Sequence, residues 1–118
     1  MLLSHFRRFH APLLGLLLVP LAASALDIQV SKTEDSLDGV CDVDCSLREA
    51  VVLANSTPGA NRISLGAATY NLTLPTPRDS EGFDTLEEDA NLNGDLDIAG
   101  TLEIIGAGAE QTLIDGNN

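Results

Sequence analysis

The residues best suited to binding a ligand are five oxygen-bearing side chains, spaced two apart in one acidic segment. They are Asp89, Asn91, Asn93, Asp95 and Asp97. With Gly94 at the sixth position, the spacing matches the first half of an EF-type calcium loop, in which the glycine permits a sharp turn. The twelfth position is Gly100, not a glutamate, so a true EF-hand is not expected. A looser Ca²⁺ loop would take a further ligand from Glu87, Glu88 or Glu103.

A simpler interpretation of this segment is favoured. Asn93 and Gly94 would form a turn, Leu96 and Ile98 would face inward from a following strand, and the acids would face solvent. Ca²⁺ therefore stays an alternative and the only candidate cofactor. A second acidic cluster has the same two interpretations. Neighbouring carboxylates repel each other unless a cation lies among them, so Ca²⁺ is an alternative here too, but a solvated loop is favoured. The members of this cluster are Asp35, Asp38, Asp42 and Asp44.

Cys41 and Cys45 are the only cysteines in the chain. An even cysteine count in an exported protein favours a disulfide. Three intervening residues can bring the two Cα atoms within bonding range if the loop turns sharply. A metal site and free thiols are the alternatives, but no second cysteine pair and no histidine after residue 25 would complete a metal site.

Residues 1–25 have the pattern of a secretory signal peptide. Arg7 and Arg8 precede an apolar run over residues 11–23, and residues 23–25 read Ala-Ser-Ala, a small-x-small cleavage pattern. A membrane anchor is the alternative, but a span needs about 20 apolar residues and prolines interrupt this run. Cleavage would leave Leu26 as the amino terminus. The sequence therefore predicts a secreted or cell-surface protein with no membrane span after cleavage.

Composition excludes several functions for residues 26–118. This stretch holds 4 basic and 18 acidic residues, a net charge of −14, and such a surface repels nucleic acid. It contains no His, Met or Trp, which excludes Ser-His-Asp and Cys-His catalysis and histidine-ligated zinc. A glycine-rich run at 104–109 precedes a strand pattern where a dinucleotide site needs a helix. We predict no enzyme activity for this stretch.

The elements that must position these residues follow from periodicity. Polar and apolar residues alternate at 27–30, which predicts a short strand. Ser46 and Glu49 form a capping box, which predicts the start of a helix that ends near Asn55. Alternation with a period of two then follows at 63–65, 70–74, 96–98, 102–104 and near 113, with glycines between. This pattern predicts a mainly β chain that starts a parallel solenoid, with one helix at its N-terminal end. A β-sandwich is the rival fold.

Residues 45–50 read CSLREA, and their surroundings resemble the CSLREA domain: DGVCD at 38–42, GDLDI at 94–98 and IIGAGA at 104–109. The resemblance implies a right-handed parallel β-helix of the pectin-lyase-like type in an exported bacterial protein. After the leader at 1–25, it implies a capping segment at 26–60 and first coils at 61–118, and these coils contain the polar, acidic insertion at 75–93. No catalytic residue is implied, and Arg48 is expected to pair with a nearby acid. The chain is expected to be the start of a longer protein.

These observations predict a non-catalytic, N-terminal capping module of an exported, surface-associated protein that acts in adhesion or polymer binding. Its expected partners are extracellular polysaccharides or cell-surface proteins. One alternative is the N-terminal part of a polysaccharide lyase or hydrolase whose catalytic residues lie beyond residue 118. Another is a small binding module stabilised by Ca²⁺.

Overall fold

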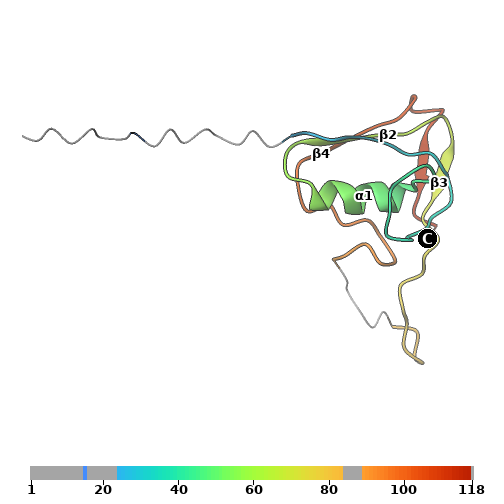
Figure 1. Ribbon diagram of the computed structural model, residues 1–118. Coiled ribbons are helices and arrows are strands. Elements are labelled where there is room, and N and C mark those ends of the chain that lie inside the picture. Colours follow the sequence, from blue (N-terminus) through green and yellow to red (C-terminus); the bar gives the residue numbers. More distant parts are fainter. Residues whose placement is uncertain (1–14, 16–23, 84–88, 118) are drawn as a thin grey trace, which may run out of the picture.

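The computed structural model describes residue 15 and residues 24–83 and 89–117. In this part of the chain there are one helix and five short strands. In chain order they are β1 (Asp27–Gln29), α1 (Leu47–Ser56), β2 (Asn61–Ser64), β3 (Thr69–Asn71), β4 (Leu102–Ile105) and β5 (Leu113–Asp115). The three-stranded sheet runs along one side of α1, and β3 lies at one end of the helix (Figure 1).

All strand pairs are parallel. One sheet has the order β1-β2-β4, and the other pairs β3 with β5. The register places Ile28 beside Ile63 and Ile63 beside Ile104, so one column of isoleucines crosses the first sheet. In β1 and β2 the buried residues alternate with exposed or half-buried ones, as the period of two predicts.

The core lies between α1 and the strands. Leu47, Ala50, Val51 and Ala54 are buried on one helix face, which confirms the predicted helical spacing. Ile28 and Ile63 from the sheet and Tyr70 from β3 complete the same buried cluster. The core is therefore small and is centred on the helix.

The prediction that the chain starts a right-handed parallel β-helix is wrong. The described residues form a three-stranded and a two-stranded parallel sheet with a single helix, and no solenoid is found among them. A solenoid repeats one unit of near-constant length. Here the helix lies between β1 and β2, whereas a long acidic segment lies between β3 and β4. Alternation and glycine corners correctly indicated short strands, but they do not determine how strands stack.

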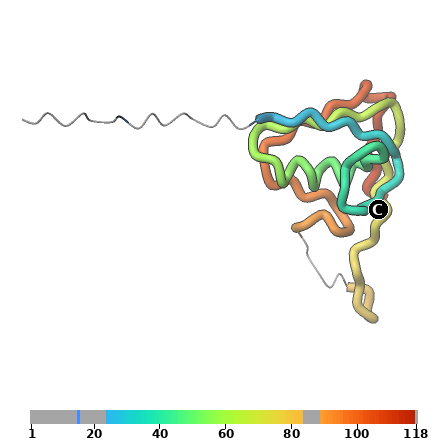
Figure 2. The backbone as a smooth tube through the Cα atoms, in the orientation of Figure 1, coloured from blue at the N-terminus to red at the C-terminus, as the bar shows by residue number. Residues whose placement is uncertain are grey.

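The expected strand at 96–98 does not form. Leu96 is partly buried against the core, as predicted, but Ile98 is 52% exposed. Instead of pairing with a strand, this segment runs beside α1; Figure 2 traces it in orange along the helix. Most of the predicted leader lies outside the described residues. In the part of the chain that is described, no helix has the length and apolar character needed to cross a membrane.

Candidate functional site

The most heavily bonded side chain of the described residues is Arg48, in the first turn of α1. Its side chain is completely buried and forms a two-pronged ion pair with Asp35: Nε donates to Oδ1 at 2.7 Å and Nη2 donates to Oδ2 at 3.0 Å. Nη1 donates to the carbonyls of Asn91 (3.3 Å) and Asp95 (3.0 Å), and Nη2 donates to that of Gly94 (2.7 Å). A guanidinium has five N–H groups, and these contacts use all five. We call this cluster the Arg48 hub.

Asp35 connects the hub to a third segment. Its Oδ2 accepts from the backbone amides of Thr73 (2.7 Å) and Leu74 (2.9 Å) as well as from Arg48. Burial alone would raise the pKa of this carboxyl. The hydrogen bonds from Arg48, Leu74 and Thr73 and the positive charge of Arg48 outweigh burial, so the pKa of Asp35 is lowered from its usual value. Asp35 is therefore ionised and fully paired at neutral pH.

Two asparagines fix the acidic segment that follows the hub. Asn91, 1% exposed and in the left-handed region at φ 59°, accepts from Asp97 N at 2.7 Å and donates to Asp97 O at 2.9 Å through its side-chain amide. Asn55 of α1 donates to Asp97 O (2.7 Å) and accepts from Ala99 N (3.0 Å). Side-chain amides thus provide the hydrogen bonds that a neighbouring strand would provide. This is the physical reason why the predicted strand is absent.

Several of the residues predicted as calcium ligands are engaged in other contacts or exposed in the structure. The Asn91 side chain bonds to the backbone of Asp97, and the carbonyl of Asp95 accepts from Arg48. Asp89 and Asp95 are exposed, and Glu103 pairs with Arg62. Glu87 and Glu88 lie outside the described residues. Within the described ranges, no group of three or more acidic, cysteine or histidine side chains is placed to hold a metal. The guanidinium of Arg48 lies on the inner side of the loop at 91–95, where it donates to three backbone carbonyls.

The predicted capping box is confirmed. Ser46 Oγ accepts from Glu49 N at 3.1 Å, and Glu49 Oε2 accepts from Ser46 N at 2.7 Å. The two side chains also hold the preceding loop: Ser46 Oγ donates to Ser36 O, and Glu49 Oε1 accepts from Ser36 Oγ and Asp38 N. Burial would raise the pKa of Glu49, but these hydrogen bonds outweigh burial and the pKa is lowered. Glu49 is therefore an ionised helix cap.

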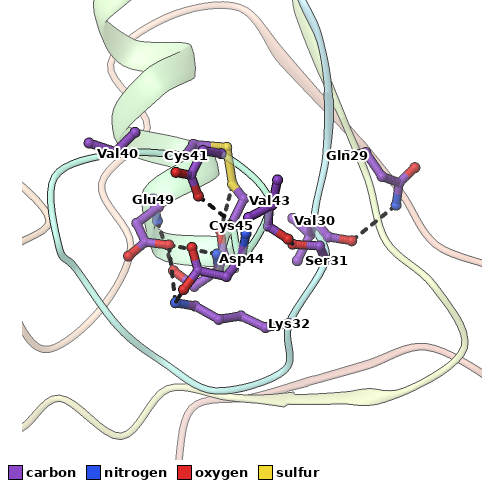
Figure 3. Close-up of a disulfide and its surroundings, with 12 residues drawn as sticks. Gln29, Val30, Ser31, Lys32, Val40, Cys41, Val43, Asp44, Cys45 and Glu49 are labelled. Carbon is purple, nitrogen blue, oxygen red and sulfur yellow. Dashed lines mark hydrogen bonds and ion pairs between the residues drawn. A yellow bond between two sulfur atoms is a disulfide. The ribbon is translucent and has the colours of Figure 1, made fainter.

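The Cys41–Cys45 disulfide is formed, which confirms the prediction and excludes both alternatives. Figure 3 shows it beside the first turn of α1, with Lys32 reaching toward Asp44 and Glu49. Cys45 is buried and its carbonyl accepts from Ser31 N at 2.9 Å. Val43, inside the closed loop, is 92% exposed. The disulfide thus holds an exposed loop against the start of the helix.

The second acidic cluster separates in the structure. Asp35 is buried in the Arg48 hub, whereas Asp42 and Asp44 are exposed. Asp44 pairs with Lys32 at 3.3 Å, and Asp38 Oδ1 accepts from Val40 N at 2.9 Å. Burial opposes the charge of Lys32, but its contacts with Asp44 and Glu49 outweigh burial and raise its pKa. The expectation of a solvated loop therefore holds for Asp38, Asp42 and Asp44, which are exposed, and is wrong for Asp35.

An open cleft of about 630 Å³ lies next to the Arg48 hub. Its walls include Leu74, Thr76, Arg78 and Asp95. Asp95 is the single carboxylate among the described residues that line it, whereas acid–base hydrolysis of a glycoside uses a pair of carboxylates. The described part of the cleft offers no acid–base pair.

Sequence reasoning did not find the hub. It expected Arg48 to pair with a nearby acid, but it identified neither Asp35 nor the three backbone carbonyls. The signal that was available is charge balance, because Arg48 is one of only four basic residues after residue 25 and lies on an apolar helix face. Sequence reasoning selected Asn91 as a possible calcium ligand but did not predict its bonds to Asp97, and it gave no indication of the contacts of Asn55 with Asp97 and Ala99.

Comparison with known proteins identifies no relative: no family model, no curated protein and no solved structure matches this chain. The resemblance of residues 45–50 and their surroundings to the CSLREA domain therefore rests on those motifs alone.

Proposed function

We propose that residues 26–118 form a non-catalytic structural module of an exported, surface-associated protein. One observation carries the proposal: all six side chains of the CSLREA run at 45–50 are buried and act in holding the fold together. Cys45 forms the disulfide, Ser46 and Glu49 cap the helix, Arg48 forms the hub, and the remaining two residues, Leu47 and Ala50, pack in the core.

The electrostatics of the module support a structural role. Catalytic and ligand-binding groups must be able to reach a substrate, whereas every N–H of Arg48 and both oxygens of Asp35 are occupied by contacts within the chain. Glu49 is equally committed, through contacts to Ser46, Ser36 and Asp38. The three buried charged side chains therefore stabilise the module and are not poised for chemistry.

Export is supported by two features. The predicted leader ends at Ala25, and the chain after it contains a disulfide, which forms and persists in oxidising compartments. The strongly acidic surface favours basic or neutral partners outside the cell over nucleic acid or anionic lipid. Adhesion or binding of an extracellular polymer is the role that fits these features.

The proposal is tested on the exported protein. We expect no cleavage of acidic polysaccharides by the purified wild-type chain, measured as new reducing ends or unsaturated products. We also expect Arg48→Met to reduce the amount of intact protein recovered outside the cell, whereas Arg62→Met, a change at an exposed arginine, should leave recovery unchanged. Cleavage by the wild-type chain, or retention of the wild-type chain in the cytoplasm, would overturn the proposal.

A further inference from the structure

Asn61, the first residue of β2, connects the start of the sheet to the end of the helix. Its side chain is buried, with 3% exposed. Oδ1 accepts from Leu26 N at 3.0 Å, while Nδ2 donates to Ala54 O at 2.9 Å and to Thr57 O at 2.7 Å. These carbonyls lie at the carboxyl end of α1, where the helix dipole is negative. The last turn of α1 carries no basic side chain.

Leu26 is firmly held in the sheet. Its carbonyl accepts from Arg62 N at 2.8 Å and its side chain packs against the core cluster. Ser24 and Ala25, immediately before it, are exposed. Leu26, the residue that the leader pattern predicts to be the first of the processed chain, thus makes ordered contacts with the sheet.

We infer that cleavage after Ala25 creates the cation for a site already present in the fold: the α-ammonium of Leu26 donates to Asn61 Oδ1 at the carboxyl end of α1. The inference rests on the proposed export of the chain. Hydrolysis of the Ala25–Leu26 bond by a leader peptidase consumes one water. Ala25 leaves with a carboxylate, and the Leu26 amine takes up a proton at neutral pH. One of its N–H groups replaces the peptide N–H in the existing hydrogen bond.

The surroundings favour the positive charge. Ala25, Asn61 and three charged side chains line an open cleft of about 410 Å³ at this point, which leaves room for the other two N–H groups to be hydrated. The charged side chains are Asp27 of β1, Arg62 of β2 and Glu103 of β4, linked by contacts of 3.8 Å and 2.9 Å. Two carboxylates outnumber the one guanidinium, and the helix end adds negative potential.

The inference predicts a raised pKa for the Leu26 amino group, above the usual value of about 7.7–8.0. A cation whose pKa is higher in the folded chain stabilises the fold below the unfolded-state pKa. That stability is lost as the pH rises through the folded-state pKa. A rise of about one unit corresponds to a roughly tenfold change in the unfolding equilibrium constant.

The test uses the exported Lys32→Arg chain, because Lys32 is the only lysine and its replacement leaves the α-amine as the single primary amine. Mass spectrometry first identifies the native amino terminus. Acetylation then removes the charge but keeps an N–H for Asn61. We expect acetylation to raise the unfolding constant about tenfold at pH 6.5 and to have little effect at pH 10.

Asn61→Asp should raise the pH midpoint of amine labelling, and the acetylation comparison stands by itself if that variant does not fold.

The outcomes separate this inference from the proposed function. An exported chain that begins at a residue other than Leu26 overturns the inference and leaves the proposed function standing. A chain that begins at Leu26 but has the same stability with and without acetylation at pH 6.5 also overturns the inference and leaves the proposed function standing. A chain that is not exported at all contradicts the proposed function itself. A Leu26 terminus together with an acetylation effect confined to low pH supports the inference.

Discussion

At the scale of the residue, Arg48 holds three separate segments together. It contacts Asp35 in the loop before α1 and the carbonyls of Asn91, Gly94 and Asp95 in the acidic segment, and Asp35 in turn holds Thr73 and Leu74. Such a contact set suits arginine and not lysine, because a planar guanidinium offers five fixed donors whereas an ammonium offers three. Together with Asn55 and Asn91, Arg48 thus holds the acidic segment through side-chain contacts instead of sheet pairing.

Replacing Arg48 by Met should destabilise the fold strongly. The change leaves the Asp35 carboxylate buried without its counter-charge, and removal of one partner of a buried ion pair costs about 3–5 kcal/mol. Arg62→Met is the matched control, since Arg62 lies on the surface and exposed pairs contribute about 0–1 kcal/mol. Urea denaturation measures the free energy of unfolding of both variants. Equal free energies of unfolding for the two variants would show that the hub does not stabilise the molecule.

The lowered pKa values of Asp35 and Glu49 predict sensitivity to acid. A carboxyl whose pKa is lower in the folded chain adds stability above its unfolded-state pKa, near 4, and that stability is lost as the pH falls through the folded-state value. We expect the melting temperature to be flat between about pH 5 and pH 7 and to fall below about pH 4. Glu49→Gln should make the fall shallower, whereas Glu110→Gln, at an exposed acid, should not. Identical pH profiles for the two variants would contradict the assignment.

At the scale of the element, α1 depends on what precedes it. The disulfide and the capping box both act on its first turn, and together they attach the loop at 31–45 to the helix. In this loop, the Ser36 hydroxyl and the Asp38 amide donate to Glu49, and the Ser36 carbonyl accepts from the Ser46 hydroxyl. The helix and this loop therefore form one structural unit.

Reduction of the disulfide should have a limited effect. The bond closes a loop of only a few residues, and the chain-entropy model gives roughly 2 kcal/mol for so short a loop. We expect the reduced protein to stay folded, with a lower midpoint in urea and with faster hydrogen exchange confined to residues near 31–45. A Cys41→Ala/Cys45→Ala variant should reproduce the same shift. Global unfolding on reduction would mean that the disulfide, and not the hub, determines the fold.

At the scale of the whole molecule, charge is the dominant feature. A net charge of −14 over residues 26–118 generates repulsion that salt screens. Added NaCl should therefore raise the melting temperature. Because Arg48 already occupies the inner side of the acidic loop, Ca²⁺ at matched ionic strength should add nothing further. A Ca²⁺-specific rise that Asp89→Ala abolishes would instead support the calcium-stabilised alternative.

Local features of this molecule could be predicted from sequence, and long-range ones could not. The capping box, the disulfide and the buried helix face depend on spacings of a few residues, so their geometry follows from the chain itself. The Arg48 hub joins residues 13 to 47 positions apart. The absent strand at 96–98 depends on Asn55 and Asn91, whose amides compete with strand pairing. The stacking of strands, on which the solenoid prediction depended, is equally a long-range property.

The row of Asp27, Arg62 and Glu103 across the first sheet has a consequence for how copies of the protein meet. The row alternates in sign from β1 to β4, with a carboxylate on each of the two outer strands, Asp27 on β1 and Glu103 on β4. A bare strand edge invites pairing with an identical edge, and Ile105 on the same strand is 41% exposed. If two copies paired through their β4 edges with Glu103 opposite Glu103, the two carboxylates would repel each other. Glu103 therefore disfavours aggregation through the β4 edge at high local concentration.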